Sequence, residues 1–139
     1  MIIISMGNKY LIDADLYIGL YNKDDAHHLQ AIDTIHSLGD KDPIYHTTWD
    51  VIDEVSTKLS YFGQKVDSTE FLSDLINTDT NVLFPDDEIL QKTIDLFKKI
   101  KTKHVSFTDC VNMVWARKLK IDKILSFDKI YKKQGFDTI

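Results

Sequence analysis

A chain of 139 residues, 43% hydrophobic and 28% charged, is long enough to form one folded domain with a sizeable core. Its single cysteine, Cys110, excludes an internal disulfide and favours a reducing compartment. No apolar run approaches the roughly 20 residues that span a bilayer. The N-terminal run MIIIS is too short for the core of a signal peptide. We therefore expect one cytoplasmic domain over residues 1–139, without a membrane segment.

Charge is unevenly distributed along the chain, although the net charge is −5. Residues 92–139 hold twelve Lys and Arg against five acids, whereas residues 1–91 hold five basic residues against seventeen acids. A domain divided in this way can present a basic surface to a polyanion while it is acidic overall. The alternative is that these cations only solvate helix surfaces. The residues that we expect to contact RNA are Lys98, Lys99, Lys101, Lys103, Arg117, Lys118 and Lys120.

Short apolar runs alternate with amphipathic segments from residue 9 onward. We predict strands at 9–13, 43–46, 81–84 and 123–127, with a last edge strand at 136–139. The predicted helices cover 14–21, 26–38, a segment capped by Thr47 or Thr48, 68–77, a segment that follows Pro85 and runs through Ile100, and 109–119 with Thr108 as its cap. In the second helix, Leu29, Ile32, Ile35 and Leu38 have helical spacing and are expected to face inward. Strands that alternate with helices imply an α/β fold with a mostly parallel sheet covered on both faces.

Four acidic residues lie beside apolar elements, where an unpaired carboxylate is unfavourable. Asp13 ends the first strand, Glu54 lies in the apolar part of its helix, Asp109 opens a helix, and Asp128 follows the strand ILSF. Sites in parallel sheets gather at the carboxyl ends of strands, and a helix N-terminus favours an anion. Carboxylates that converge repel one another unless a divalent cation lies between them, and Mg²⁺ or Mn²⁺ prefers such oxygen ligands.

Five stretches carry these residues in a recognisable order: YLIDADLYIGLY, HHLQA, TTWDVIDEVSTKL, VSFTDCVNMVWARKLKIDKILSFD and KIYKKQGFD. In this order they resemble the PIN-domain ribonucleases, most closely the VapC-like toxins, and they cover nearly the whole chain. The resemblance implies a three-layer fold with strand order 3-2-1-4-5. It also matches Asp13, Glu54, Asp109 and Asp128 to the acidic quartet of the family.

The activity that this resemblance implies is a metal-dependent endoribonuclease. Mg²⁺ or Mn²⁺ would be held by Asp13, Asp109 and Asp128, with Glu54 binding directly or through water, and would activate a water for in-line attack on phosphorus. The implied partners are an RNA substrate, a second copy in a homodimer and, if the protein is the toxin of a toxin–antitoxin pair, a small antitoxin. A stand-alone processing nuclease is the other form of this activity.

Asp15 departs from the family pattern, which usually has Ser, Thr or Asn at this position. It either orients Asp13 or a water on the metal, or it adds a ligand. The sequence Asp-x-Asp after a strand also resembles the haloacid-dehalogenase phosphatases, with Asp13 as nucleophile and Asp15 as general acid. That family has Gly and Thr or Val where this chain has Leu16 and Tyr17. A receiver-like module or a non-catalytic PIN-like scaffold is a further alternative, but a scaffold is expected to have lost part of the quartet.

Three further positions have open interpretations. Asn112 either orients a ligand, touches the RNA backbone, or is a polar residue on an exposed helix face. His28 and Ala31 match a recurrent H-x-x-A of the family, which we interpret as structural. Asp53 lies beside Glu54, but the acid of the family usually precedes an apolar residue, which favours Glu54.

Overall fold

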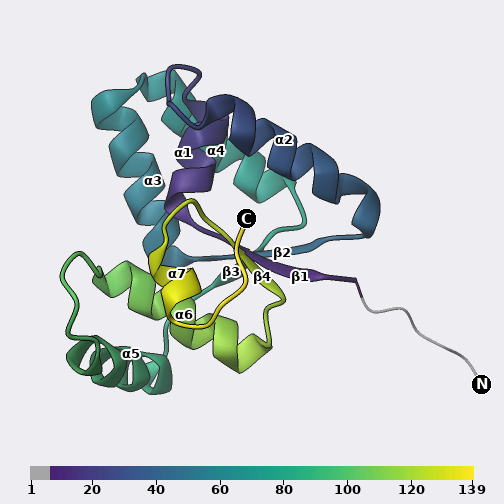
Figure 1. Cartoon of the computed structure of the whole chain (residues 1–139). Helices are drawn as coiled ribbons and strands as arrows, with labels where there is room; N and C mark the ends of the chain where they lie inside the picture. Colours follow the sequence, from purple (N-terminus) through teal and green to yellow (C-terminus); the bar gives the residue numbers. More distant parts are fainter. Residues whose placement is uncertain (1–6) are drawn as a thin grey trace, which may run out of the picture.

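A sheet of four parallel strands forms the centre of the molecule (Figure 1). The structure is a computed structural model that describes residues 7–139, so the run MIIIS lies outside the described residues. The strands are β1 (Lys9–Ile12), β2 (Ile44–Thr48), β3 (Asn81–Leu83) and β4 (Lys123–Leu125). Their order is β3-β2-β1-β4, which agrees with the first four positions of the expected order. In place of the expected edge strand at 136–139, Thr138 forms an isolated parallel bridge with Ile124.

Helices cover both faces of this sheet and complete three layers (Figure 1). On one face lie α1 (Ala14–Tyr21), α2 (His28–Leu38), α3 (Trp49–Phe62) and α4 (Lys65–Asn77). On the other lie α5 (Asp87–Lys99), α6 (Phe107–Leu119) and the short α7 (Ile130–Lys133). A short 3-10 helix, η1 (Gly39–Lys41), follows α2. Among residues 7–139, no helix combines the length and the apolar character needed to cross a membrane. The predicted α/β fold with a parallel sheet flanked by helices is confirmed.

The central strand β1 contributes to both halves of the hydrophobic core. Tyr10 and Ile12 pack among side chains of α1 to α4, whereas Leu11 packs among side chains of α5 to α7. All three are buried, as is usual for a strand whose two faces are both covered. Asp13 follows this strand directly and caps α1, so its carboxylate lies at the edge of the core.

Helix α6 begins two residues earlier than predicted, because its cap is Ser106 and not Thr108. The Ser106 hydroxyl accepts a hydrogen bond from the Asp109 N–H at 3.0 Å, and the Asp109 carboxylate accepts one from the Ser106 N–H at 2.9 Å. This reciprocal capping box satisfies two backbone donors at the helix start. It also fixes the position of the Asp109 side chain.

Helix α2 does not bury all of its apolar positions as predicted. Leu29 is 75% exposed and Ile32 is 37% exposed, because α2 is an outer helix that approaches α1 closely through Ala31. A Cβ added at Gly19 of α1 would lie 3.0 Å from the Ala31 Cβ, so this close crossing leaves little room for a side chain at position 19. The His28 ring bonds through Nδ1 to the Gly19 carbonyl oxygen at 2.7 Å. The structural interpretation of the H-x-x-A motif therefore agrees with the packing of α2 on α1.

Candidate active site

Four acidic side chains from three places in the chain meet at the carboxyl ends of β1 and β4. Asp13 and Asp15 enter from the start of α1, Asp109 from the first turn of α6, and Asp128 from the segment after β4. Asp13 is 6% exposed and Asp109 is 8% exposed, whereas Asp128 is exposed to solvent. Two carboxylates thus lie at the inner end of the cluster, and Asp128 lies at its mouth.

Ser126, the first residue after β4, joins three of these acids. Its hydroxyl lies 2.9 Å from Oδ2 of Asp13 and 3.1 Å from Oδ2 of Asp15. It also accepts a hydrogen bond from the Asp128 N–H at 3.1 Å. Because a hydroxyl has a single hydrogen, it cannot donate fully to both carboxylates at once. Asp15 receives a second hydrogen bond from the Phe127 N–H at 2.9 Å, so it ties the start of α1 to the segment after β4.

Asn112 and Tyr131 join the other pair of acids. The Asn112 amide donates to Oδ1 of Asp13 at 3.0 Å and to the Tyr131 hydroxyl at 3.0 Å. Tyr131 in turn donates to Oδ1 of Asp109 at 3.2 Å. The Asn112 carbonyl accepts from the Thr48 hydroxyl at 2.9 Å, which fixes the orientation of the amide. Asn112 and Tyr131 are fully buried, so the alternative of an exposed polar residue at Asn112 is wrong.

The electrostatics of the cluster oppose the charged form of its acids. Burial, and then the charge of Asp15, raise the pKa of Asp13 to about 7. Burial raises the pKa of Asp15, and the charge of Asp128 raises it further. The pKa of Asp109 is also raised, first by burial and then by Asp128. Hydrogen bonds from Ser126 act against these shifts at Asp13 and Asp15 but do not cancel them.

Glu54 is the one predicted quartet member with no hydrogen bond to this network among the described residues. It lies on α3, where its carboxylate pairs with Lys58 of the same helix at 2.7 Å. Its side chain is 32% exposed, while the neighbouring Asp53 is exposed. The structure therefore brings together Asp13, Asp109, Asp128 and Asp15, and leaves Glu54 in a separate ion pair.

Ser126 and Tyr131, which hold the acids together, are not among the functional residues predicted from the sequence. Their positions in the chain are the signal that the sequence offers for them. Ser126 is a small polar residue at the carboxyl end of a buried strand, and Tyr131 lies three residues after Asp128. Neither position specifies the partner, which only the tertiary fold supplies.

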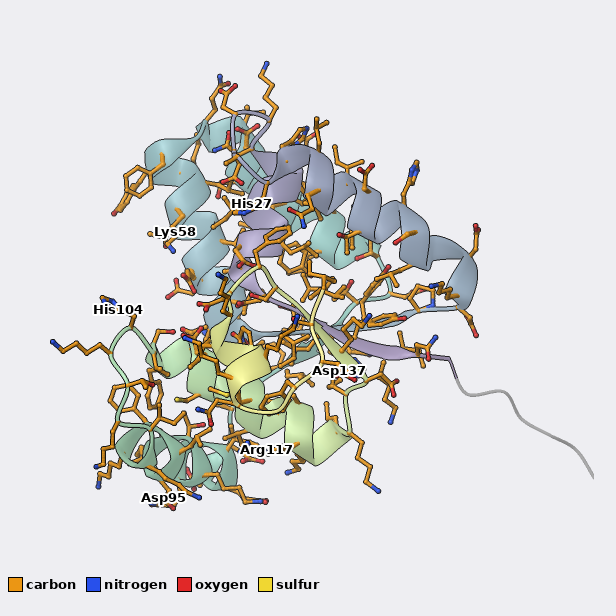
Figure 2. All side chains as sticks on the ribbon, viewed as in Figure 1. His27, Lys58, Asp95, His104, Arg117 and Asp137 are labelled. Carbon is orange, nitrogen blue, oxygen red and sulfur yellow. The ribbon has the colours of Figure 1, made fainter. Side chains whose placement is uncertain are left out.

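The predicted RNA-binding cations occupy two regions around α5 and α6. Lys98 and Lys99 end α5, Lys101 and Lys103 lie in the following loop, and Arg117, Lys118 and Lys120 are at the end of α6. Lys99, Lys101 and Arg117 line one hollow of about 370 Å³. Lys118 instead lies 3.5 Å from Glu88 of α5. Figure 2 labels Arg117 at the C-terminal end of α6 and His104 in the loop that leads to the start of this helix.

The four carboxylates of the cluster offer only oxygen atoms as metal ligands, which suits a hard divalent cation. One carboxylate oxygen, Oδ1 of Asp15, is buried without a hydrogen-bond partner. A bound cation would give this buried oxygen a partner. It would also favour the charged form of the three carboxyl groups whose pKa values are raised. Within residues 7–139, however, no three His, Cys, Asp or Glu side chains are already arranged as ligands of one ion.

Several solved structures resemble this chain, although no family profile and no curated relative matches its sequence. VapC20 from Mycobacterium tuberculosis, a toxin that cleaves the sarcin–ricin loop, aligns with a TM-score of 0.82 at 20% identity over 91% of this chain and 95% of that one. FitAcB from Neisseria gonorrhoeae aligns with a TM-score of 0.68 at 11% identity, over 94% and 96% of the two chains. VapBC2 from Rickettsia felis, bound to a DNA fragment from its promoter, aligns with a TM-score of 0.67 at 10% identity, over 94% and 97%.

These similarities define the fold as that of the PIN domains. More narrowly, it is a VapC-like PIN fold, the kind present in toxin–antitoxin structures, and the resemblance found in the sequence is confirmed at the level of the fold. The acids of the cluster lie at the carboxyl ends of the strands of this fold.

Proposed function

We propose that the protein is a VapC-like endoribonuclease that depends on Mg²⁺ or Mn²⁺. The observation that carries this proposal is the pair of buried acids, Asp13 and Asp109, which Asn112 and Tyr131 join at the carboxyl end of the central sheet. Burying two carboxylates without a cation is costly. An arrangement that nevertheless holds the two carboxylates in place is suited to binding a divalent cation. The likeness to VapC20, a toxin that cleaves the sarcin–ricin loop, supports RNA as the substrate.

Asp13, Asp109 and Asp128 would hold the cation, and Glu54 would act directly or through water. Asp128 is exposed and Glu54 partly so, and both side chains would turn inward from their present hydrogen bonds. When bound, the cation supplies charge that binds a phosphate oxygen and makes a water more acidic. Asn112 and Tyr131 keep the carboxylates of Asp13 and Asp109 oriented. Asp109 lies in the first turn of α6, where the helix dipole favours an anion.

The proposed partners follow from the same likeness. VapBC2 and a Klebsiella pneumoniae structure are toxin–antitoxin assemblies, which supports a small antitoxin as the partner of this chain. The homodimer is proposed from the family resemblance of the sequence, and the cytoplasmic location from its single cysteine. The exposed rings of Trp49 and Phe84, 5.5 Å apart, offer apolar surface for such contacts. A neighbouring reading frame for a small antitoxin would distinguish a toxin from a stand-alone nuclease.

Cleavage of single-stranded RNA by the purified protein tests the proposal. After treatment with chelator the protein should be inactive, and Mg²⁺ or Mn²⁺ should restore cleavage with products that carry a 5′-phosphate. A parallel assay with para-nitrophenyl phosphate tests the phosphatase alternative. Hydrolysis of that ester without any cleavage of RNA would reverse the proposal.

Asp15→Asn separates the nuclease from the phosphatase. The asparagine carbonyl can still accept from Phe127 N–H and Ser126, so RNA cleavage should fall by less than about tenfold, the effect of one weakened hydrogen bond. If Asp15 is a general acid, the same change should cost about 100-fold or more. Steady-state rates of the variant and the wild type on RNA and on para-nitrophenyl phosphate distinguish the nuclease from the phosphatase.

Removing positive charges from the hollow beside α5 and α6 should weaken RNA binding without changing the binding of Mg²⁺ or Mn²⁺. We expect Lys99→Gln with Lys101→Gln to reduce affinity for all single strands, and to flatten the salt dependence by about 0.7 for each phosphate that the protein no longer neutralises. Lys41→Gln with Lys65→Gln removes the same charge from the acidic half of the chain and is the matched control. Equal salt slopes in the two double variants would mean that the cations of the hollow only solvate the surface.

A further inference from the structure

A second pocket, of about 300 Å³, opens beside the acidic cluster between α1, the α1–α2 loop and α3. We name it the α1–α3 pocket. Ile18 and Leu59 give it an apolar lining, Phe62 lies at its edge with 82% of the residue exposed, and Lys58 provides a cation. Asp15 lines the pocket as well, so the pocket and the acidic cluster share a residue. Its size is at the lower end of the range for pockets that bind small molecules.

An aromatic pair connects this pocket to the segment that carries Asp128. The His27 ring, which lines the pocket, stacks on Phe127 with centroids 4.3 Å apart and planes 10° from parallel. Phe127 directly precedes Asp128, and its N–H bonds to Asp15. Figure 2 labels His27 and Lys58, which lie on the same side of the molecule beside α1 and α3. A group in the pocket would therefore lie next to a phosphate at the acidic cluster.

We propose that the α1–α3 pocket binds an unpaired nucleobase of the RNA, adjacent to the bond that the acidic cluster cleaves. This inference rests on the proposed nuclease function. The His27–Phe127 pair and Phe62 offer aromatic faces, on which unpaired bases stack. Lys58 lies on the same rim and is about half exposed, so its ammonium group can contact the backbone phosphate of that nucleotide in addition to Glu54, its partner at 2.7 Å. An apolar lining, aromatic walls and one cation are the features that single-stranded RNA sites combine.

The polar groups at the pocket favour guanine. Asp25 and Asn22 line the pocket, and Oδ1 of Asp25 already accepts a hydrogen bond from the backbone N–H of His27 at 2.8 Å. Each carboxylate oxygen has two lone pairs, so both oxygens of Asp25 can still accept hydrogen bonds from the edge of a base. Guanine is the base that presents two adjacent donors, its ring N–H and its amino group, to one carboxylate. Inosine lacks the amino group and is the matched probe.

Binding in chelator tests the pocket independently of catalysis. The probes are single-stranded uridine oligomers of about ten nucleotides with a central guanosine, inosine or abasic site, followed by fluorescence anisotropy. The wild type should bind the guanosine oligomer about 5- to 100-fold more tightly than the abasic one, the effect of one stacked base. His27→Ala and Phe62→Ala should lose this difference. Tyr61→Ala is the control, because it removes a neighbouring ring that is 77% exposed and lies outside the pocket. This variant should keep the difference in affinity between the guanosine and abasic oligomers.

Asp25→Asn provides a second, more conservative test. It should keep the preference for a base over the abasic site but lose the preference for guanosine over inosine. If Phe62→Ala and His27→Ala behave like Tyr61→Ala while the protein cleaves RNA, the pocket proposal is overturned and the nuclease remains. If the base preferences hold but no cation induces cleavage, the pocket remains a base-binding site, and the proposals of nuclease function and of an adjacent cleaved bond both fall.

Discussion

Asp109→Asn should abolish cation-dependent cleavage of RNA while the protein remains folded. A change to a residue that merely orients a metal ligand typically costs about 10- to 100-fold in activity, so losing a ligand should cost more than about 100-fold. Fold should be retained because asparagine can still accept from the Ser106 N–H of the capping box. Cleavage rates at saturating Mn²⁺, measured beside a circular dichroism spectrum, check both expectations.

The control for this variant is Asp95→Asn, which removes one carboxylate from the exposed face of α5, where its partner is Gln91. It should cleave at the wild-type rate. Without metal, Asp109→Asn should be at least as stable as the wild type, because one of the mutually repelling carboxylates is gone. Wild-type activity in Asp109→Asn would show that the acidic cluster is not the catalytic site.

Metal-free protein should become less stable as the pH rises from 5 to 8, and Asp13 should account for much of this loss. The pKa of Asp13 is about 7 in the folded protein against an ordinary value of 3.8, so the folded state holds this proton more tightly. The stabilisation from this proton is complete below pH 4 and is lost as the pH rises through 7. Between pH 5 and 8 the loss should be about 2–3 kcal/mol, from 1.36 kcal/mol for each pKa unit.

Asp13→Asn removes this titration and keeps the shape of the side chain. The free energy of unfolding can be measured by urea titration in the presence of chelator. As the pH rises, the value for Asp13→Asn should increase relative to that of the wild type. Saturating Mg²⁺ should remove much of the pH dependence of the wild type, because a cation replaces the proton. Parallel curves for the two proteins would mean that Asp13 titrates normally.

The fold was predictable because its signals are local. A run such as Tyr10-Leu11-Ile12, apolar at every position, is typical of a strand that is buried on both faces. Helix boundaries were less certain where two capping residues lie close together. Ser106 and Thr108 are both good caps, and the choice depends on Asp109 completing the box with Ser106. Helix α4 likewise starts at Lys65, ahead of the predicted 68, because Gln64 and Asp67 form a capping box.

The site was predictable in part, for a related reason. Strand ends and helix starts locate Asp13, Asp109 and Asp128 without knowledge of tertiary contacts. Bonds between distant side chains are different. Asn112 and Asp13 are separated by 99 residues, and their hydrogen bond depends on how α6 packs against β1. Helical periodicity also could not reveal that Leu29 is exposed, since it gives the apolar face of a helix but not whether a partner covers it.

Calorimetric titration of Mn²⁺ into metal-free protein tests the central claim, that the acidic cluster binds a divalent cation. The wild type should bind Mn²⁺ saturably and release protons below pH 7, because the cation displaces the proton that Asp13 holds. Asp109→Asn should bind more weakly by at least about tenfold, and Asp95→Asn should match the wild type. Wild-type protein that takes up no Mn²⁺, or an Asp109→Asn variant that binds it equally well, would contradict the account.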